Sequence, residues 1–201
     1  MGVERRERIL DAATRRFTTS GYSQTSLADI ARDVGVTSPG VTHHFPTKQH
    51  ILLAITERRF DVLNELAESQ PPAGDGTGTL RMMLALTTRL VSEPGLMELF
   101  VRVSAEAADP HSTAHDLFKD RYDRVVGQVV ARFREEVDNG LLVPDIDYEA
   151  LAREAIAVTD GLQLQWVLTG GAIDLVGMIR AYLERLAPGI LVSGATVSLS
   201  D

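Results

Sequence analysis

Apolar side chains recur every three or four residues along almost the whole chain, and this spacing restricts the fold more than any other feature. It places the apolar groups on one side of an α-helix, whereas a half-buried strand would alternate them every second residue. Strand-like alternation is scarce in these 201 residues, and no repeat with a period of about 20–50 residues is visible. The sequence therefore predicts an all-α fold.

Capping residues, glycines and prolines divide this pattern into about nine helices. Ser26, followed three residues later by Asp29, has the form of a capping box. Ser38 is expected to cap the third helix, with Pro39 as its first residue, and Pro188 is expected to end the last one. The expected helices cover residues 3–20, 26–35, 38–45, 48–69, 78–92, 95–108, 112–139, 147–169 and 172–187.

A cluster of prolines and glycines at 70–78 is the clearest linker in the chain. It predicts a three-helix domain at 1–48, a connecting helix at 49–70 and a helical bundle at 71–189. The tail 190–201 carries no signal that assigns it.

Composition excludes several classes of protein. Cysteine is absent, which excludes disulfide frameworks, thiol catalysis and cysteine-bound zinc. No apolar run is long enough for a membrane span, and the N-terminus does not lead into the apolar core of a signal peptide. We therefore expect a soluble, cytoplasmic protein with no membrane partner.

The charge is distributed unevenly. The net charge is −8, but residues 1–48 carry seven bases and five acids, and the acids dominate the rest of the chain. The 23 residues between Asp33 and Glu57 contain no acid. An acid-free stretch in an acidic protein indicates a surface that faces anions such as phosphate.

Three residues suggest how two short helices meet at the start of this stretch. Ala31 is small enough for close helix contact, Gly35 tolerates a left-handed turn, and Val41 closes the contact with an apolar group. Two helices joined by such a turn form a helix-turn-helix, whose second helix enters the major groove of DNA.

Residues 5–55 resemble the tetracycline-repressor (TetR) family of transcriptional regulators. The resemblance rests on Gly21-Tyr22, on Thr25-Ser26-Leu27-Ala28-Asp29-Ile30-Ala31, on Gly35-Val36-Thr37, on His43-His44-Phe45-Pro46-Thr47-Lys48 and on Leu52. It implies a homodimeric repressor that binds a palindromic DNA operator through 1–48. It also implies that 71–189 forms the dimer and binds a small ligand that releases the DNA.

The short third helix and its neighbours supply the candidate DNA contacts. Their small or hydrogen-bonding groups can reach base edges or phosphates, and Lys48 begins the next helix, where helix amides and an ammonium both favour an anion. The family usually has a tyrosine where Thr42 stands, so the resemblance implies a shorter reach there. The candidates are Ser26, Thr37, Ser38, Gly40, Thr42, His43, His44, Thr47 and Lys48.

Helix 147–169 is nearly uncharged between Ala155 and its end, with Asp160 as the exception. A helix that is apolar almost all round is buried in a core or contacts a partner chain. Together with the last helix it predicts a four-helix dimer interface. The candidate interface residues are Ala152, Ala155, Thr159, Leu162, Leu175, Val176, Ile179, Tyr182 and Leu183.

Methionines and aromatic residues on several helices suggest a pocket for a small apolar or amphipathic ligand. The same residues also fit an ordinary core, and Asp160, Gln163, Gln165 and Trp166 could orient a ligand or bond across a dimer. The candidate pocket residues are Met82, Met83, Leu86, Leu90, Met97, Phe100, His115, Phe118, Tyr122, Gln163 and Trp166.

Two other functions are considered. His111 and His115 have the spacing of metal ligands on a helix, and with Asp116 they would support a metal-dependent hydrolase. The usual hydrolase and phosphate-binding motifs are absent from the sequence. A helical adaptor that binds only protein is the third possibility. We expect no catalytic residues, no metal and no cofactor.

Overall fold

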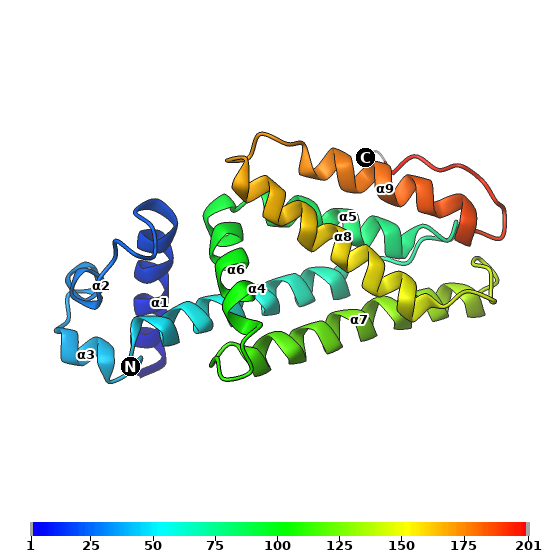
Figure 1. Ribbon diagram of the computed structural model, residues 1–201. Coiled ribbons are helices and arrows are strands. Elements are labelled where there is room, and N and C mark those ends of the chain that lie inside the picture. Colours follow the sequence, from blue (N-terminus) through cyan, green and yellow to red (C-terminus); the bar gives the residue numbers. More distant parts are fainter. Residues whose placement is uncertain (1, 200–201) are drawn as a thin grey trace. The chain divides into compact units, whose positions relative to one another are not determined.

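The computed structural model describes residues 2–199, which form nine α-helices (Figure 1). The all-α prediction is confirmed. One isolated antiparallel bridge joins Leu142 to Leu191. None of the described helices is long and apolar enough to cross a membrane. The end of the unassigned tail, residues 200–201, lies outside the described part, as does residue 1. The helices are α1 (Gly2–Thr19), α2 (Leu27–Val34), α3 (Ser38–Thr42), α4 (Lys48–Ser69), α5 (Gly78–Val91), α6 (Pro94–Ala107), α7 (His115–Asp138), α8 (Tyr148–Leu168) and α9 (Leu175–Ile190).

The described residues form two compact units. Unit 1 comprises the chain up to Val62 together with Glu93–His115, and unit 2 comprises Leu63–Ser92 together with the chain from Asp116 onward. The division therefore falls inside α4 rather than at the linker 70–78. In addition, α6 belongs with the N-terminal helices, although the sequence suggested a place in the C-terminal bundle.

In unit 1, α1 contacts both α2 and α6, and α2 contacts α3. The contact between α1 and α6 depends on Gly95, since a Cβ atom there would overlap the Thr18 side chain and lie 2.9 Å from Thr18 Cα. The absence of a side chain at Gly95 allows α6 to approach α1 this closely. The buried core of the first four helices includes Ile9, Leu10, Phe17, Ile30, Val41, Ile51 and Leu52.

The predicted helix-turn-helix contact is confirmed. Ala31 and Val41 are buried, and Gly35 has a φ of 72°, in the left-handed region that favours glycine. The Val36 amide donates to the Ala31 carbonyl oxygen at 3.0 Å, which closes the end of α2. The capping box is also present, with Ser26 and Asp29 bonding reciprocally.

The start of α3 differs from the expectation by one residue. Thr37, not Ser38, is the cap, because its hydroxyl oxygen accepts a hydrogen bond from the Gly40 amide at 3.2 Å. Ser38 is therefore the first helical residue and Pro39 the second, where a proline still loses no helical hydrogen bond.

In unit 2, α9 contacts both α5 and α8, and the chain direction alternates along α7, α8 and α9 (Figure 1). Glu136 of α7 joins α5, since its carboxylate accepts from the Thr79 amide at 3.0 Å and from the Thr79 hydroxyl at 2.9 Å. The Arg132 guanidinium donates to the Ala67 and Gln70 carbonyl oxygens, each at 2.8 Å, and so joins α7 to the end of α4.

Two helix ends, the start of α7 and the end of α9, were predicted incorrectly. Helix α7 begins at His115 rather than near 112, because the Ser112 hydroxyl accepts from the Ala114 amide and stabilises a turn there. Helix α9 continues through Pro188 to Ile190. Its last turn is held from outside, since the Val143 amide donates to the Ile190 carbonyl oxygen at 2.8 Å.

Candidate DNA-binding surface and ligand groove

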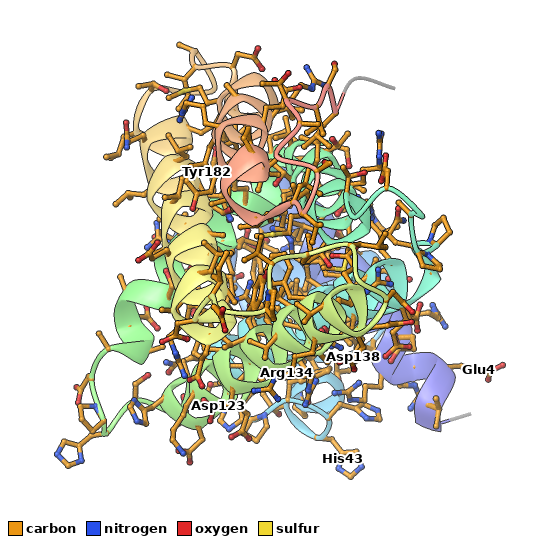
Figure 2. All side chains as sticks on the ribbon, turned by 90° about the vertical axis from the view of Figure 1, so that its right-hand side faces the viewer. Glu4, His43, Asp123, Arg134, Asp138 and Tyr182 are labelled. Carbon is orange, nitrogen blue, oxygen red and sulfur yellow. The ribbon has the colours of Figure 1, made fainter. Side chains whose placement is uncertain are left out.

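Helix α3 presents a small polar surface to solvent. Val41 is its buried residue, whereas Thr37, Thr42 and His43 are exposed. Ser38 and Gly40 are partly exposed. Figure 2 shows His43 projecting away from the ribbon. The predicted candidates on α3 therefore share one accessible surface with no acidic side chain.

Gly40 is not required by the packing of the protein itself. A Cβ atom at this position would lie 3.5 Å from both Thr37 Oγ1 and Val36 Cβ, which is ordinary contact. The bare backbone of Gly40 thus leaves room on the outer surface of α3, where another molecule can approach closely.

Lys48 is held by the protein rather than extended into solvent. Its ammonium donates to the Tyr22 carbonyl oxygen at 2.8 Å and to the Thr25 carbonyl oxygen at 2.9 Å. It also lies 4.4 Å from the centre of the Tyr22 ring. An ammonium has three N–H donors, so two backbone bonds leave one donor for an anion. Lys48 thus anchors the loop before α2, a role that the sequence did not reveal.

Ser26 serves mainly as a cap. Its hydroxyl donates to the Asp29 carboxylate at 2.6 Å, and the Ser26 amide donates to the same carboxylate at 3.1 Å. These bonds, with help from Arg32, hold the pKa of Asp29 at about 2, below its usual 3.8. At the start of α4, the Thr47 hydroxyl lies 2.8 Å from His50 Nδ1, and the partly exposed His44 ring packs edge-on against the ring of His43.

Acidic side chains of α1 and α2 pair with arginines inside unit 1. Arg16 binds Asp33 in a two-bond contact, at 2.5 and 2.7 Å, and its hydrogen bond lowers the pKa of Asp33. Arg58 of α4 binds Asp11 at 2.8 Å and Glu7 at 3.4 Å. The negative charge of these helices is thereby offset within the unit, which keeps the surface around α3 favourable to an anion.

Unit 2 contains a groove of about 420 Å³ between α7 and α8, and this volume suits a small organic molecule. It is lined by Tyr122, Val126, Arg153, Ile156, Ala157 and Asp160. The Tyr122 hydroxyl donates to Asp160 Oδ2 at 2.6 Å. Burial raises the pKa of Asp160 above its usual value, and burial beside this carboxylate also raises the pKa of Tyr122.

The predicted pocket residues are divided between the two units. Met97, Phe100 and His115 belong to unit 1, and the other eight belong to unit 2. Of the eleven, Tyr122 lines the groove, and the partly exposed Leu86 does not. Trp166 instead covers the turn after α8, where a Cβ on Gly171 would lie 3.2 Å from the indole. The following are buried as core side chains: Met82, Met83, Leu90, Met97, Phe100, Phe118 and Gln163.

The groove residues that the sequence did not single out are Val126, Arg153, Ile156 and Ala157. A signal for two of them was available, because Ile156 and Arg153 lie one and two helical turns before Asp160 on α8. The sequence left open whether Asp160 orients a ligand or bonds across a dimer, and Asp160 was not among the candidate pocket residues.

Five predicted dimer residues are enclosed within one protomer, so this part of the prediction is corrected. Their side chains are at most 1% exposed because they pack where α5, α8 and α9 meet. They are Ala152, Ala155, Leu175, Ile179 and Leu183. Thr159, Leu162, Val176 and Tyr182 keep partial exposure. The sequence missed the apolar residues with larger exposure, namely Leu164 and Leu168 of α8 and Met178 of α9.

The histidine pair that suggested a metal site is not on one helix. His111 precedes α7, His115 is its first residue, and His115 Nδ1 lies 2.9 Å from the Ala107 carbonyl oxygen. Within residues 2–199, no group of three or more His, Asp or Glu side chains is arranged to hold a metal ion. The spacing on which the hydrolase alternative depended is therefore not realised.

Comparison with known proteins agrees with this geometry. The family model "Bacterial regulatory proteins, tetR family" matches residues 9–55, and "BetI-type transcriptional repressor, C-terminal" matches residues 77–188. The regulator TtgR of Pseudomonas putida is 26% identical over 199 residues, covering 93% of this chain and 94% of its own. The regulator AcrR of Shigella flexneri is 28% identical over 193 residues, covering 91% and 87%.

Solved structures are similar over nearly the whole chain. A regulator from Saccharomonospora viridis in complex with choline has a TM-score of 0.76 and 28% identity, covering 94% of this chain and 98% of its own. A TetR regulator from Haloarcula marismortui has a TM-score of 0.82 at 20% identity, covering 94% and 99%, and supports the fold alone. Since the two matched segments span most of the sequence, the chain belongs to the TetR family of bacterial transcriptional regulators.

Proposed function

We propose that this protein is a transcriptional repressor that binds a palindromic double-stranded DNA operator as a homodimer and is released by a small ligand. The single observation that carries the proposal is the exposed, acid-free polar surface of α3, held by a helix-turn-helix. As a regulator it acts on DNA in the cytoplasm, without catalysing a reaction. The residues expected to touch DNA are those on α3 and at the start of α4.

Within the surface of α3, different residues have different expected roles. Thr37, Thr42 and His43 are exposed and carry groups that can bond to base edges. Gly40 allows a close approach of the α3 backbone to the DNA. Lys48 uses its remaining donor for a phosphate, so it contributes affinity without sequence preference.

Accessible apolar residues on α8 and α9 support the proposed dimer. Leu164 is 44% exposed, Leu168 is 75% exposed, and Met178 is 43% exposed. Exposed apolar residues that gather on neighbouring helices favour contact with a second copy. Dimerisation pairs two α3 helices, which read half-sites about 34–36 Å apart.

The ligand is proposed to be a small apolar or amphipathic molecule bound by unit 2. Support comes from the groove between α7 and α8, with its aliphatic and aromatic walls. A ligand that binds better to one dimer conformation than to the other shifts the protein away from the DNA-binding form.

The proposal is tested by measuring binding of the purified protein to the promoter region of its own operon, with a scrambled duplex as reference. We expect sequence-selective binding at low salt. Thr42→Ala should change the base preference or lower the affinity. Thr19→Ala is the matched control, because the exposed Thr19 hydroxyl also bonds to its own helix, at the Arg15 carbonyl oxygen. Equal binding to both duplexes would contradict the assignment as a repressor and favour the alternative of an adaptor that binds only protein.

A further inference from the structure

We propose that the groove between α7 and α8 binds neutral apolar molecules that carry a hydrogen-bond-donating hydroxyl group, with Asp160 as the receiving residue. This inference rests on the proposed function, because it specifies the ligand class of the same regulator. It is carried by the arrangement of hydrogen-bond acceptors in the groove.

The walls of the groove are largely apolar, and its polar groups are the Tyr122–Asp160 pair and Arg153. Val126, Ile156 and Ala157 supply aliphatic surface, and Tyr122 supplies an aromatic ring. The Asp160 carboxylate lies among them, bonded to the Tyr122 hydroxyl at 2.6 Å. A ligand that fits these walls has an apolar body with one polar end.

The polar groups beside the groove have unused acceptor capacity. Tyr122 bonds to Oδ2 of Asp160, whereas Oδ1 has a contact of 3.5 Å with Gln163 Nε2, at the limit of a hydrogen bond. Gln163 follows Asp160 on the same side of α8. Its side chain is buried, at 2% exposure, and its amide oxygen has no hydrogen-bond partner in the described structure.

The orientation of the Gln163 amide follows from chemistry. An ionised carboxylate only accepts hydrogen bonds, so the amide nitrogen must face Asp160 and the amide oxygen must face elsewhere. A buried acceptor without a partner is unfavourable. Asp160 lines the groove and therefore favours a ligand that donates a hydrogen bond rather than one that accepts it.

The charges around the groove favour a neutral ligand over an ion. The Asp160 carboxylate disfavours an anion. The Arg121 guanidinium lies 5.1 Å from the centre of the Tyr122 ring, and Arg153 lines the groove while paired with Glu149 at 3.0 Å. Arg121 offsets the charge of Asp160, and Glu149 offsets that of Arg153, so little net charge is left to attract a cation. A phenol meets both requirements of the groove, a neutral ligand and a hydrogen-bond donor. Its hydroxyl is uncharged and forms a strong, charge-assisted hydrogen bond with a carboxylate.

The test compares two molecules of nearly the same shape, para-butylphenol and its methyl ether para-butylanisole, by isothermal titration calorimetry with the full-length protein. The phenol donates a hydrogen bond and the ether does not. We expect the phenol to bind about tenfold or more tightly than the ether, as is typical when a hydrogen bond to a charged group is lost. Equal affinities, or no binding of either compound, would overturn the proposal without any variant being made.

Asp160→Asn identifies the receiving residue. It keeps the size of the side chain but removes the charge, so the preference for the phenol should fall to about threefold or less. Asp138→Asn is the matched control, since Asp138 is exposed on α7 (Figure 2). Thermal melting verifies that both variants fold. An unchanged preference in a folded Asp160→Asn variant would contradict the role of Asp160. A third compound, para-butylbenzylamine, is a cation of similar shape. If it binds more tightly than the phenol, the proposal that the groove prefers neutral ligands is wrong.

Operator binding by the wild-type protein separates this inference from the proposed function. If the protein binds its operator but does not distinguish the phenol from the ether, the ligand class is wrong and the repressor assignment stands. If the protein distinguishes the two compounds but binds no DNA, the repressor assignment fails and the groove assignment stands.

Discussion

At the scale of single residues, hydrogen bonds decide which charged groups are committed to the fold. Asp29 and Lys48 both lie near the surface that α3 presents, yet each is bound to backbone groups of unit 1. Their bonds fix the start of α2 and the loop before it. Charge near a nucleic-acid surface is therefore not evidence of DNA contact until the partners of each group are known.

Asp29 gives a prediction about pH. Its pKa in the folded protein is about 2, mainly because the Ser26 hydroxyl donates to it, against 3.8 for an unperturbed group. The stability that the ionised carboxylate supplies is therefore fully present above pH 3.8 and is lost as the pH falls from there to about 2. Ser26→Ala should raise the pKa of Asp29 toward 3.8, measured by NMR titration of the carboxyl carbon.

Asp33 is the internal control for this titration. Its lowered pKa depends first on the hydrogen bond from Arg16, not on Ser26. The Asp33 midpoint should stay in place in the Ser26→Ala variant. A common shift of Asp29 and Asp33 would indicate a general rearrangement of α2 and contradict the role given to the capping box.

Lys48 gives a prediction about stability. Lys48→Met removes two hydrogen bonds from a charged donor, so the free energy of unfolding in urea should fall by about 1.5–3 kcal/mol. Lys119→Met, at an exposed lysine of α7, is the control and should change stability by less than about 0.5 kcal/mol. Equal effects of the two substitutions would mean that Lys48 is an ordinary surface lysine.

At the scale of helices, the main finding is that α6 belongs to unit 1 with the N-terminal helices, although the helices before and after it in sequence belong to unit 2. The absence of a side chain at Gly95 allows the close crossing of α6 and α1 at Thr18. In the same unit, the Arg102 guanidinium of α6 lies 5.9 Å from the centre of the Tyr22 ring, on which Lys48 also rests. Helix α6 thus contacts the loop that precedes the helix-turn-helix.

Gly95→Ala tests this crossing. The added methyl group would overlap Thr18, so α6 and α1 must move apart, and the free energy of unfolding should fall by about 1–3 kcal/mol. Gly127→Ala is a matched control on α7, where a Cβ atom would have no neighbour within 4 Å. It should stabilise its helix by about 0.5–1 kcal/mol. Stabilisation by both substitutions, measured by urea unfolding, would show that the crossing tolerates a side chain.

At the scale of the whole molecule, α4 is the element that both units share. Residues up to Val62 belong to unit 1, and those from Leu63 belong to unit 2. The linker at 70–78 therefore lies inside unit 2. There Gly78 packs so closely that a Cβ atom would lie 2.8 Å from Glu136 Oε1. A segment rich in proline and glycine can be a packed part of a domain rather than a flexible link.

The proposed dimer is tested with Leu168→Asp and Met178→Asp combined. Charges on the exposed apolar surface of α8 and α9 should produce a monomer in light scattering and weaken operator binding by about tenfold or more, since one protomer reads only one half-site. Val3→Asp is the control, because Val3 is 77% exposed and Leu168 is 75% exposed. A double variant that remains a dimer would place the interface elsewhere.

The sequence by itself determined the helices and the helix-turn-helix, because helical periodicity, the capping box and a glycine turn act between residues close in the chain. Tertiary structure decided what depends on distant contacts. Contacts between distant residues pack α6 against α1 and allow α9 to continue through Pro188. They also bind the Lys48 ammonium to two carbonyl oxygens and bury Ala152 inside the protomer. Periodicity says which side of a helix is apolar. Whether that side meets the core, a ligand or a second chain depends on which helices pack together, and no local pattern encodes that.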